Sequence, residues 1–312
     1  LTAAPDNPVY RADGNCLTER ATGRLAAGCS SSVIPADGSV QEIGEWAFSN
    51  CLNLKSVDIP PSVIKIGARA FSHCTALTAV TIPAGVQEIG DRAFMACAAL
   101  QNVTILSGVT AIGKEAFARC TALTGIALPA GTGKVSDGLF RDCEALAEVT
   151  LPSTVTEIGA SAFSECASLN KILIPAGVKK IGDDAFFHCK SLPAVALYGA
   201  ESIGASAFSG CEALSAVYLA KVKEIGDEAF SFAEALTEIF IPRSVERIGQ
   251  RAFDGCPKLT VRVVPDERPD SWAPDWNGGC PVEWGASGDF DLDSGIPDPA
   301  APAKAAAKPA PK

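Results

Sequence analysis

The sequence is poor in the side chains on which most catalytic and metal sites depend. Only two histidines occur among its 312 residues, His73 and His188. It contains no phosphate-binding loop, no Gly-x-Ser-x-Gly motif and no zinc signature. This scarcity predicts that the protein is not an enzyme, and it indicates neither a metal nor a cofactor.

Long hydrophobic runs and basic clusters are missing as well. Although 47 % of the residues are hydrophobic, no apolar run is long enough for a transmembrane segment. The formal net charge of -10 argues against nucleic acid as a partner, because phosphate binding needs a basic face. No charged-then-apolar leader precedes "LTAAPDNPVY", a start typical of a chain after leader removal or trimming, so export stays open.

What the sequence does have is repetition. An Ile-Gly pair recurs every 23 residues, with two steps of 22, and the fifth copy carries Val135-Ser136 in its place. The nine regular pairs begin at Ile43, Ile66, Ile89, Ile112, Ile158, Ile181, Ile203, Ile225 and Ile248. Ten tandem copies predict a stack of similar coils in which neighbours bury each other's apolar faces, because one copy is too small to fold alone.

Each copy has the pattern of a short strand followed by a turn. In the copy around Leu169–Pro175, apolar and variable positions alternate, which is strand periodicity, and proline ends the strand. Gly159 suits a tight turn with an unusual backbone angle. The stretch "ASAFSEC" is too short for a stable helix and predicts a helical or 3₁₀ turn, with Ala162, Phe163 and Cys166 facing inward.

The repeated phrase L-x-x-V-x-I-P-x-x-V-x-x-I-G-x-x-A-F-x-x-C resembles the BspA-like, treponemal-type leucine-rich repeat proteins. The resemblance covers residues from about 35 to 265, and both flanks resemble the end coils of that family. It implies a curved α/β-type leucine-rich repeat solenoid with about ten coils. Each coil of 22–23 residues would contain a short parallel strand and a short helical or 3₁₀ turn. The resemblance further implies an exported protein of the bacterial surface that adheres to host components.

We divide the chain into four parts on this basis. Residues 1–40 form an irregular N-terminal capping coil, 41–265 the repeat array, 266–285 a C-terminal capping segment, and 286–312 a disordered Ala/Pro/Lys-rich tail. In the last copy, Arg262 falls at a core position. Either the register slips there by one residue or the core opens.

The twelve cysteines do not have the spacing of a disulfide scaffold. Nine occupy one repeat position, which Ala233 fills in the ninth copy. Side chains at equivalent positions run parallel, whereas a disulfide needs converging Cβ vectors, so we expect reduced packing cysteines. Cys16 and Cys29 could pair in the first coil, a question that the sequence leaves open. Cys280 has no evident partner.

Other polar candidates have a plain structural interpretation. His73 and His188 lie five coils apart, ~24 Å at ~4.8 Å per coil, too far to share a site. The acidic pairs Asp183-Asp184 and Asp227-Glu228 are typical of a solubilising surface. The segment 289–295, "DFDLDSG", lacks the glycine and glutamate of a calcium loop and is interpreted as an acidic linker.

One set of variable positions becomes apolar late in the array. Strand side chains alternate, so the residue between the two core positions faces the concave surface. In the sixth to ninth copies this position and the one after the strand carry Leu173, Tyr198, Tyr218 and Phe240. A contiguous exposed apolar patch usually marks a contact site. We expect it to bind a protein partner, and the family resemblance implies a host extracellular protein; a homo-oligomer contact, coverage by the tail and a register error are the alternatives.

The sequence therefore favours protein recognition by a repeat surface. Two other classes remain open: a structural homo-oligomer, and a protein that binds a hydrophobic small molecule on the same patch. Reduced cysteines would suit the cytoplasm. The family resemblance favours export, to the cell surface, the periplasm or the medium, and we expect export.

Overall fold

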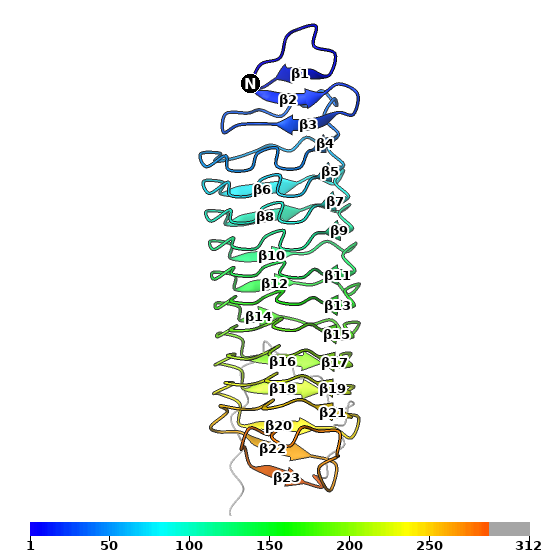
Figure 1. The fold of residues 1–312 in the computed structure, drawn as a ribbon, viewed down its shortest axis with the longest axis vertical. Coiled ribbons are helices and arrows are strands. Elements are labelled where there is room, and N and C mark those ends of the chain that lie inside the picture. Colours follow the sequence, from blue (N-terminus) through cyan, green and yellow to red (C-terminus); the bar gives the residue numbers. More distant parts are fainter. Residues whose placement is uncertain (287–312) are drawn as a thin grey trace, which may run out of the picture.

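The computed structural model describes residues 1–286, in which 23 β-strands and no helix are found. Figure 1 shows an elongated stack of coils that runs from the N-terminal β1 at one end to β23 at the other. The predicted repeat solenoid is confirmed. The predicted tail, residues 286–312, lies almost wholly outside the described residues, as does the acidic segment 289–295.

From residue 79 onward, one side of each coil contributes a strand to what we call the long ladder. Its strands are parallel and in register, so that Val80 pairs with Val103 and Val149 with Ile172. They are β6 (Ala79–Ile82), β8 (Asn102–Ile105), β10 (Gly125–Ala127), β12 (Glu148–Thr150), β14 (Lys171–Ile172), β16 (Ala194–Leu197), β18 (Ala216–Leu219), β20 (Glu238–Ile241), β22 (Thr260–Val263) and β23 (Val282–Trp284).

A second side contributes two-residue strands, the short ladder, which contain the isoleucine of each Ile-Gly pair. Ile43 pairs with Ile66, and Ile158 with Ile181, again in parallel. The strands are β4 (Glu42–Ile43), β5 (Lys65–Ile66), β7 (Glu88–Ile89), β9 (Ala111–Ile112), β11 (Lys134–Val135), β13 (Glu157–Ile158), β15 (Lys180–Ile181), β17 (Ser202–Ile203), β19 (Glu224–Ile225) and β21 (Arg247–Ile248).

The first strands differ from the array in direction. β1 (Tyr10–Asp13) pairs antiparallel with β2 (Cys16–Glu19), which pairs antiparallel with β3 (Arg24–Ala27). Only β3 then runs parallel to β4, through Leu25 and Ile43. At the other end, β23 extends the long ladder by pairing with β22.

The third side of each coil, which we call the turn face, consists of the short 3₁₀-type turns that the sequence predicts as one of its two options, and it contains no helix. Ala70, Ser72 and Cys74 donate their N–H to the carbonyl three residues earlier, as in a 3₁₀ turn. The residues between them donate instead to the next coil: Arg69 to Asp91, Phe71 to Ala93 and His73 to Met95. This alternation requires left-handed backbone at two positions per coil, such as Arg69 (φ 53°) and His73 (φ 61°), and it interrupts any continuous helix.

Ten phenylalanines form a continuous column through the core. Neighbouring rings are stacked with centroids 5.0–6.0 Å apart. The column begins at Phe48, whose ring lies against the α-carbon of Gly28, and ends where the edge of Trp276 meets Phe253. Burial of the predicted inward residues Ala162, Phe163 and Cys166 is confirmed. The column removes a large aromatic surface from water in every coil.

The reason given above for Gly159 is wrong. Its φ is not positive; the positive values occur two and six residues further along the coil. A Cβ on Gly159 would instead lie 2.7 Å from the backbone nitrogen of Asp137 in the preceding coil. Gly67 and Gly182 face the preceding coil in the same way. The recurring glycine is therefore required by the close approach of successive coils.

All twelve cysteines are free, Cys16 and Cys29 included. In the array, the thiol donates to the carbonyl of the preceding coil's phenylalanine, for example Cys143 Sγ to Phe117 O at 3.2 Å. Cys280 forms no disulfide, as expected, and makes the same bond, to Phe253 O at 3.3 Å. Burial raises the pKa of these array thiols; that of Cys143 rises to about 12.

Two of the polar residues assigned to the surface also hold the coils together. Asp183 Oδ1 accepts the N–H of Ala205 at 2.9 Å, and Asp227 Oδ1 accepts that of Gln250 at 2.8 Å. His188 pairs with Glu165 of the preceding coil at 2.9 Å. The Asp183 and Asp227 carboxylates therefore link each coil to the next by hydrogen bonds to its backbone.

Candidate functional site

The structure settles the register in the region of the predicted patch. Tyr218 lies in β18 opposite Ala196 of β16, and Phe240 lies in β20 opposite Arg262 of β22. Val261 and Val263 are buried, while the side chain of Arg262 is 44 % exposed. The register of the last copy therefore slips by one residue, which places Arg262 on the outward row, and the core stays closed.

The four predicted residues lie on the outward side of the long ladder over consecutive coils. Leu173, directly after β14, is 62 % exposed. Tyr198 follows β16, and Tyr198, Tyr218 and Phe240 are partly buried. Burial raises the pKa of the Tyr198 phenol, and the neighbouring Tyr218 adds to this effect, so the two phenols lie near each other. Tyr218, Ala196 and Leu173 thus follow one another along a single row.

The long ladder is interrupted beside this row. In the preceding coils the residue ahead of the strand donates its N–H to the coil before, as Ala147 does to Thr124 and Asn170 to Ala147. The next coil has Pro193 at this position, which has no N–H to donate to Asn170. Accordingly, β14 ends one sheet and β16 begins another. This interruption falls within the row, between Leu173 of one coil and Tyr198 of the next, and the ladder breaks again between β18 and β20.

Charged groups border the apolar row at both ends. On the N-terminal side, Lys171 Nζ lies 2.6 Å from Glu148 Oε1. On the C-terminal side, Arg262 lies between Glu238 and Glu283, at 3.2 and 3.0 Å. The row is therefore an apolar surface with a polar rim, the composition typical of a protein contact surface.

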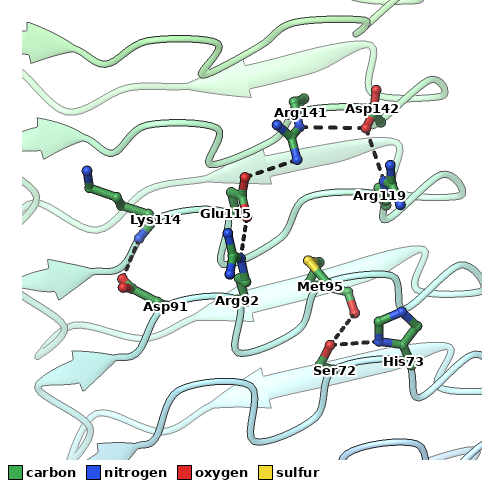
Figure 2. A network of polar contacts seen from close by, with 10 residues as sticks. All are labelled: Ser72, His73, Asp91, Arg92, Met95, Lys114, Glu115, Arg119, Arg141 and Asp142. Atoms are coloured by element: carbon green, nitrogen blue, oxygen red, sulfur yellow. Dashed lines mark hydrogen bonds and ion pairs between the residues drawn. The ribbon is translucent and has the colours of Figure 1, made fainter.

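A second polar cluster lies on the turn face, and sequence reasoning missed it. Glu115 binds both Arg92 and Arg141, and Asp142 binds Arg141 and Arg119 (Figure 2). Gly138 of the irregular fifth copy makes room for it, because a Cβ there would lie 2.9 Å from Glu115 Cγ. In the sequence, Gly138 is the feature that could have indicated this cluster. Since each carboxylate already binds two guanidinium groups, the cluster joins coils and offers no vacant charge for a ligand.

Among residues 1–286, no group of three or more His, Cys, Asp or Glu residues is placed to hold a metal ion. The same part of the chain has no helix that could cross a membrane.

These features define a leucine-rich repeat solenoid. The family model described as BspA type leucine rich repeat region matches residues 27–147 and 133–260 in six copies. The chain belongs to this family. A search of curated proteins found no match.

Solved structures of bacterial proteins agree with this assignment. A leucine rich cell surface protein from Faecalibacterium prausnitzii is 28 % identical, with 91 % of this chain and 97 % of that chain covered and a TM-score of 0.51. A leucine rich repeat protein from T. pallidum is 25 % identical over 69 % of this chain and 91 % of its own, with a TM-score of 0.50. The pneumococcal vaccine antigen PcpA is 20 % identical over 80 % and 67 %, with a TM-score of 0.53, and shares the fold.

Proposed function

We propose that this solenoid recognises another protein, in the manner of an adhesin, through the outward row formed by Leu173, Tyr198, Tyr218 and Phe240. The observation that carries the proposal is the series of large apolar side chains on the outward face of consecutive coils, of which Leu173 is 62 % exposed and the three aromatic residues are partly exposed. Aromatic residues at the centre of a contact surface, with charges at its rim, supply most of the binding free energy in protein complexes.

The same features support a binding role without catalysis. The ionisable groups near the row, such as Glu238, Arg262 and Glu283, are engaged with one another in ion pairs at the rim. Export to the cell surface or the medium is part of the proposal, and its support is the family together with the described cell surface protein of F. prausnitzii. The partner would then be an extracellular protein, such as one of a host.

The experiment compares three proteins on one immobilised panel of purified extracellular-matrix and serum proteins. They are the wild type, the variant Tyr198→Ser/Tyr218→Ser/Phe240→Ser, and Phe232→Ser. Phe232 is a matched control because it is a 54 % exposed aromatic residue on the turn face of the same region. We expect the triple variant to lose binding at least tenfold while Phe232→Ser binds like the wild type.

Self-association is the second candidate, and light-scattering mass as a function of concentration distinguishes it. A wild type that dimerises, with a triple variant that stays monomeric and no panel protein bound, would assign the row to assembly. A co-purified hydrophobic compound in native mass spectrometry would favour a small ligand. Equal binding of the wild type and the folded triple variant to a panel protein would disprove the proposal.

A further inference from the structure

One cysteine differs chemically from all the others. Cys29 follows β3 and is partly exposed, whereas the cysteines of the array from Cys74 onward are buried. Its Sγ lies 3.4 Å from Ser31 Oγ and 3.6 Å from Ser32 Oγ. These hydroxyl contacts, with the nearby backbone, lower the pKa of the Cys29 thiol to about 7, whereas burial raises the pKa of each of the other eleven.

A second thiol, that of Cys16, lies in the neighbouring strand β2. The pairing of β2 with β3 sets Leu17 opposite Ala27, which brings Cys16 and Cys29 to the same end of this hairpin. Ser32 Oγ, in contact with Cys29, donates to the carbonyl of Asn15 at 2.7 Å. Cys16 Sγ lies 3.7 Å from the carbonyl of Val33, the residue after Ser32. The two sulfurs therefore flank the Ser32–Val33 segment, and the negative charge of Cys29 raises the pKa of Cys16.

We propose that Cys29 and Cys16 form a reactive dithiol site that exchanges with small-molecule disulfides and closes a Cys16–Cys29 bridge in the N-terminal coil. Cys29 is the attacking thiol because it is the accessible one. Cys16, fully buried against the backbone, is the thiol that displaces the adduct. The bridge would tie β2 to the segment after β3, at the end of the molecule where the parallel array has no further coil.

The chemistry balances with the small disulfide as the oxidant. The Cys29 thiolate attacks RSSR, forming a Cys29–S–SR mixed disulfide and releasing RS⁻. Cys16 gives its proton to RS⁻, and its sulfur attacks Cys29 Sγ, which forms the protein disulfide and releases a second thiolate that is protonated by solvent. The protein dithiol is oxidised by two electrons, and RSSR is reduced to two RSH.

Cys51 is the competing partner. Its Sγ lies 3.8 Å from the carbonyl of Gly28, the residue before Cys29, and Cys29 raises its pKa too. Cys51, however, belongs to the column position whose thiol points at a carbonyl of the preceding coil. Alanine occupies that position at Ala233, so Cys51→Ala is a tolerated control.

The first part of the test is alkylation of the native protein with iodoacetamide, followed by peptide mapping. We expect Cys29 to be modified first, at a rate that rises with pH around a midpoint of about 7. The second part treats the whole chain with oxidised glutathione. Wild type and Cys51→Ala should each lose two thiols and yield a Cys16–Cys29 peptide, whereas Cys16→Ala should stop at a glutathione adduct on Cys29.

Three results would overturn the inference: an unmodified Cys29, a glutathione adduct that persists on Cys29 in the wild type, or a bridge from Cys29 to Cys51. If Cys16→Ala unfolds, the buried cysteines of the array become alkylated, which shows that the variant has lost its fold. The presence or absence of the Cys16–Cys29 peptide in the wild-type map then decides the inference.

Discussion

At the scale of single residues, each recurring side chain has its own contact. Each phenylalanine ring stacks on the rings of the neighbouring coils. Each cysteine thiol donates a second hydrogen bond to a carbonyl that already accepts one within its turn, as Cys97 does to Phe71 O. Departures from this scheme inside the core include Thr132, at a position where most coils have valine, and Ala233, at a position where the other coils have cysteine. Both departures have measurable consequences.

Thr132→Val should stabilise the protein. Thr132 is 2 % exposed and its hydroxyl has no hydrogen-bond partner, whereas Val109 and Val155 fill the same position in the adjacent coils. Because an unpaired buried hydroxyl costs about 1–3 kcal/mol, we expect the free energy of unfolding to rise by about 1 kcal/mol. Urea denaturation measures it. A loss of stability would show that the hydroxyl has a partner, such as a buried water.

Ala233→Cys should also stabilise, for a different reason. A thiol at position 233 would lie between Cys211 and Cys256 in the column and could donate to Phe208 O, as Cys256 does to Phe230 O at 3.2 Å. One such bond contributes on the order of 1 kcal/mol or less. The reverse change, Cys143→Ala, should cost a similar amount. Thermal unfolding of both variants measures these changes. Unfolding temperatures that shift in the same direction for Ala233→Cys and Cys143→Ala would contradict a role for the thiol as donor.

At the scale of the coil, the spacing between neighbours is set by what lies between them. The glycine after each short strand permits contact with the preceding backbone, and the left-handed residues of the turn direct alternate N–H groups to the next coil. The ladders are interrupted at three places. The long ladder breaks between β14 and β16, where Pro193 removes a donor, and again between β18 and β20, and the short ladder breaks between β9 and β11, where Ser136 replaces glycine.

The glycine positions give a matched pair of variants. In Gly182→Ala the new methyl group would lie 2.5 Å from the nitrogen of Ala160, so successive coils must separate. We expect a loss of about 2 kcal/mol or more in the free energy of unfolding. Gly133→Ala meets nothing within 4 Å and should change stability little. Equal effects of the two substitutions in denaturant titrations would refute the account of close coil approach.

Much of this element-level structure follows from the sequence, and the rest has identifiable causes. The period, the inward Phe163 and Cys166 and the strand alternation could be predicted because burial imposes them on every copy. The left-handed positions within the predicted turn could not, because they carry residues such as Arg69, His73 and Glu165, which do not signal that conformation. The role of Asp183 was missed because its partner is the backbone of another coil. For the candidate site, the register of Arg262 required the observed pairing with Phe240.

At the scale of the whole molecule, the stack presents faces of different character. The short ladder carries alternating charges, such as Lys65 with Glu88 and Lys134 with Glu157, and the turn face carries the Glu115 network. The outward row of the long ladder carries the large apolar residues Leu173, Tyr218 and Phe240. A rigid frame that repeats and a surface row that varies allow the binding face to change without loss of the fold.

The central claim is that this row contacts the partner, and site-specific photo-cross-linking tests it most directly. Tyr218→p-benzoylphenylalanine places the reactive group in the row, and Phe232→p-benzoylphenylalanine places it on the turn face. With a saturating panel protein that binds the wild type, we predict a cross-linked product from position 218, with the mass of the partner added, and none from position 232. A product from 232 with none from 218 would contradict the claim.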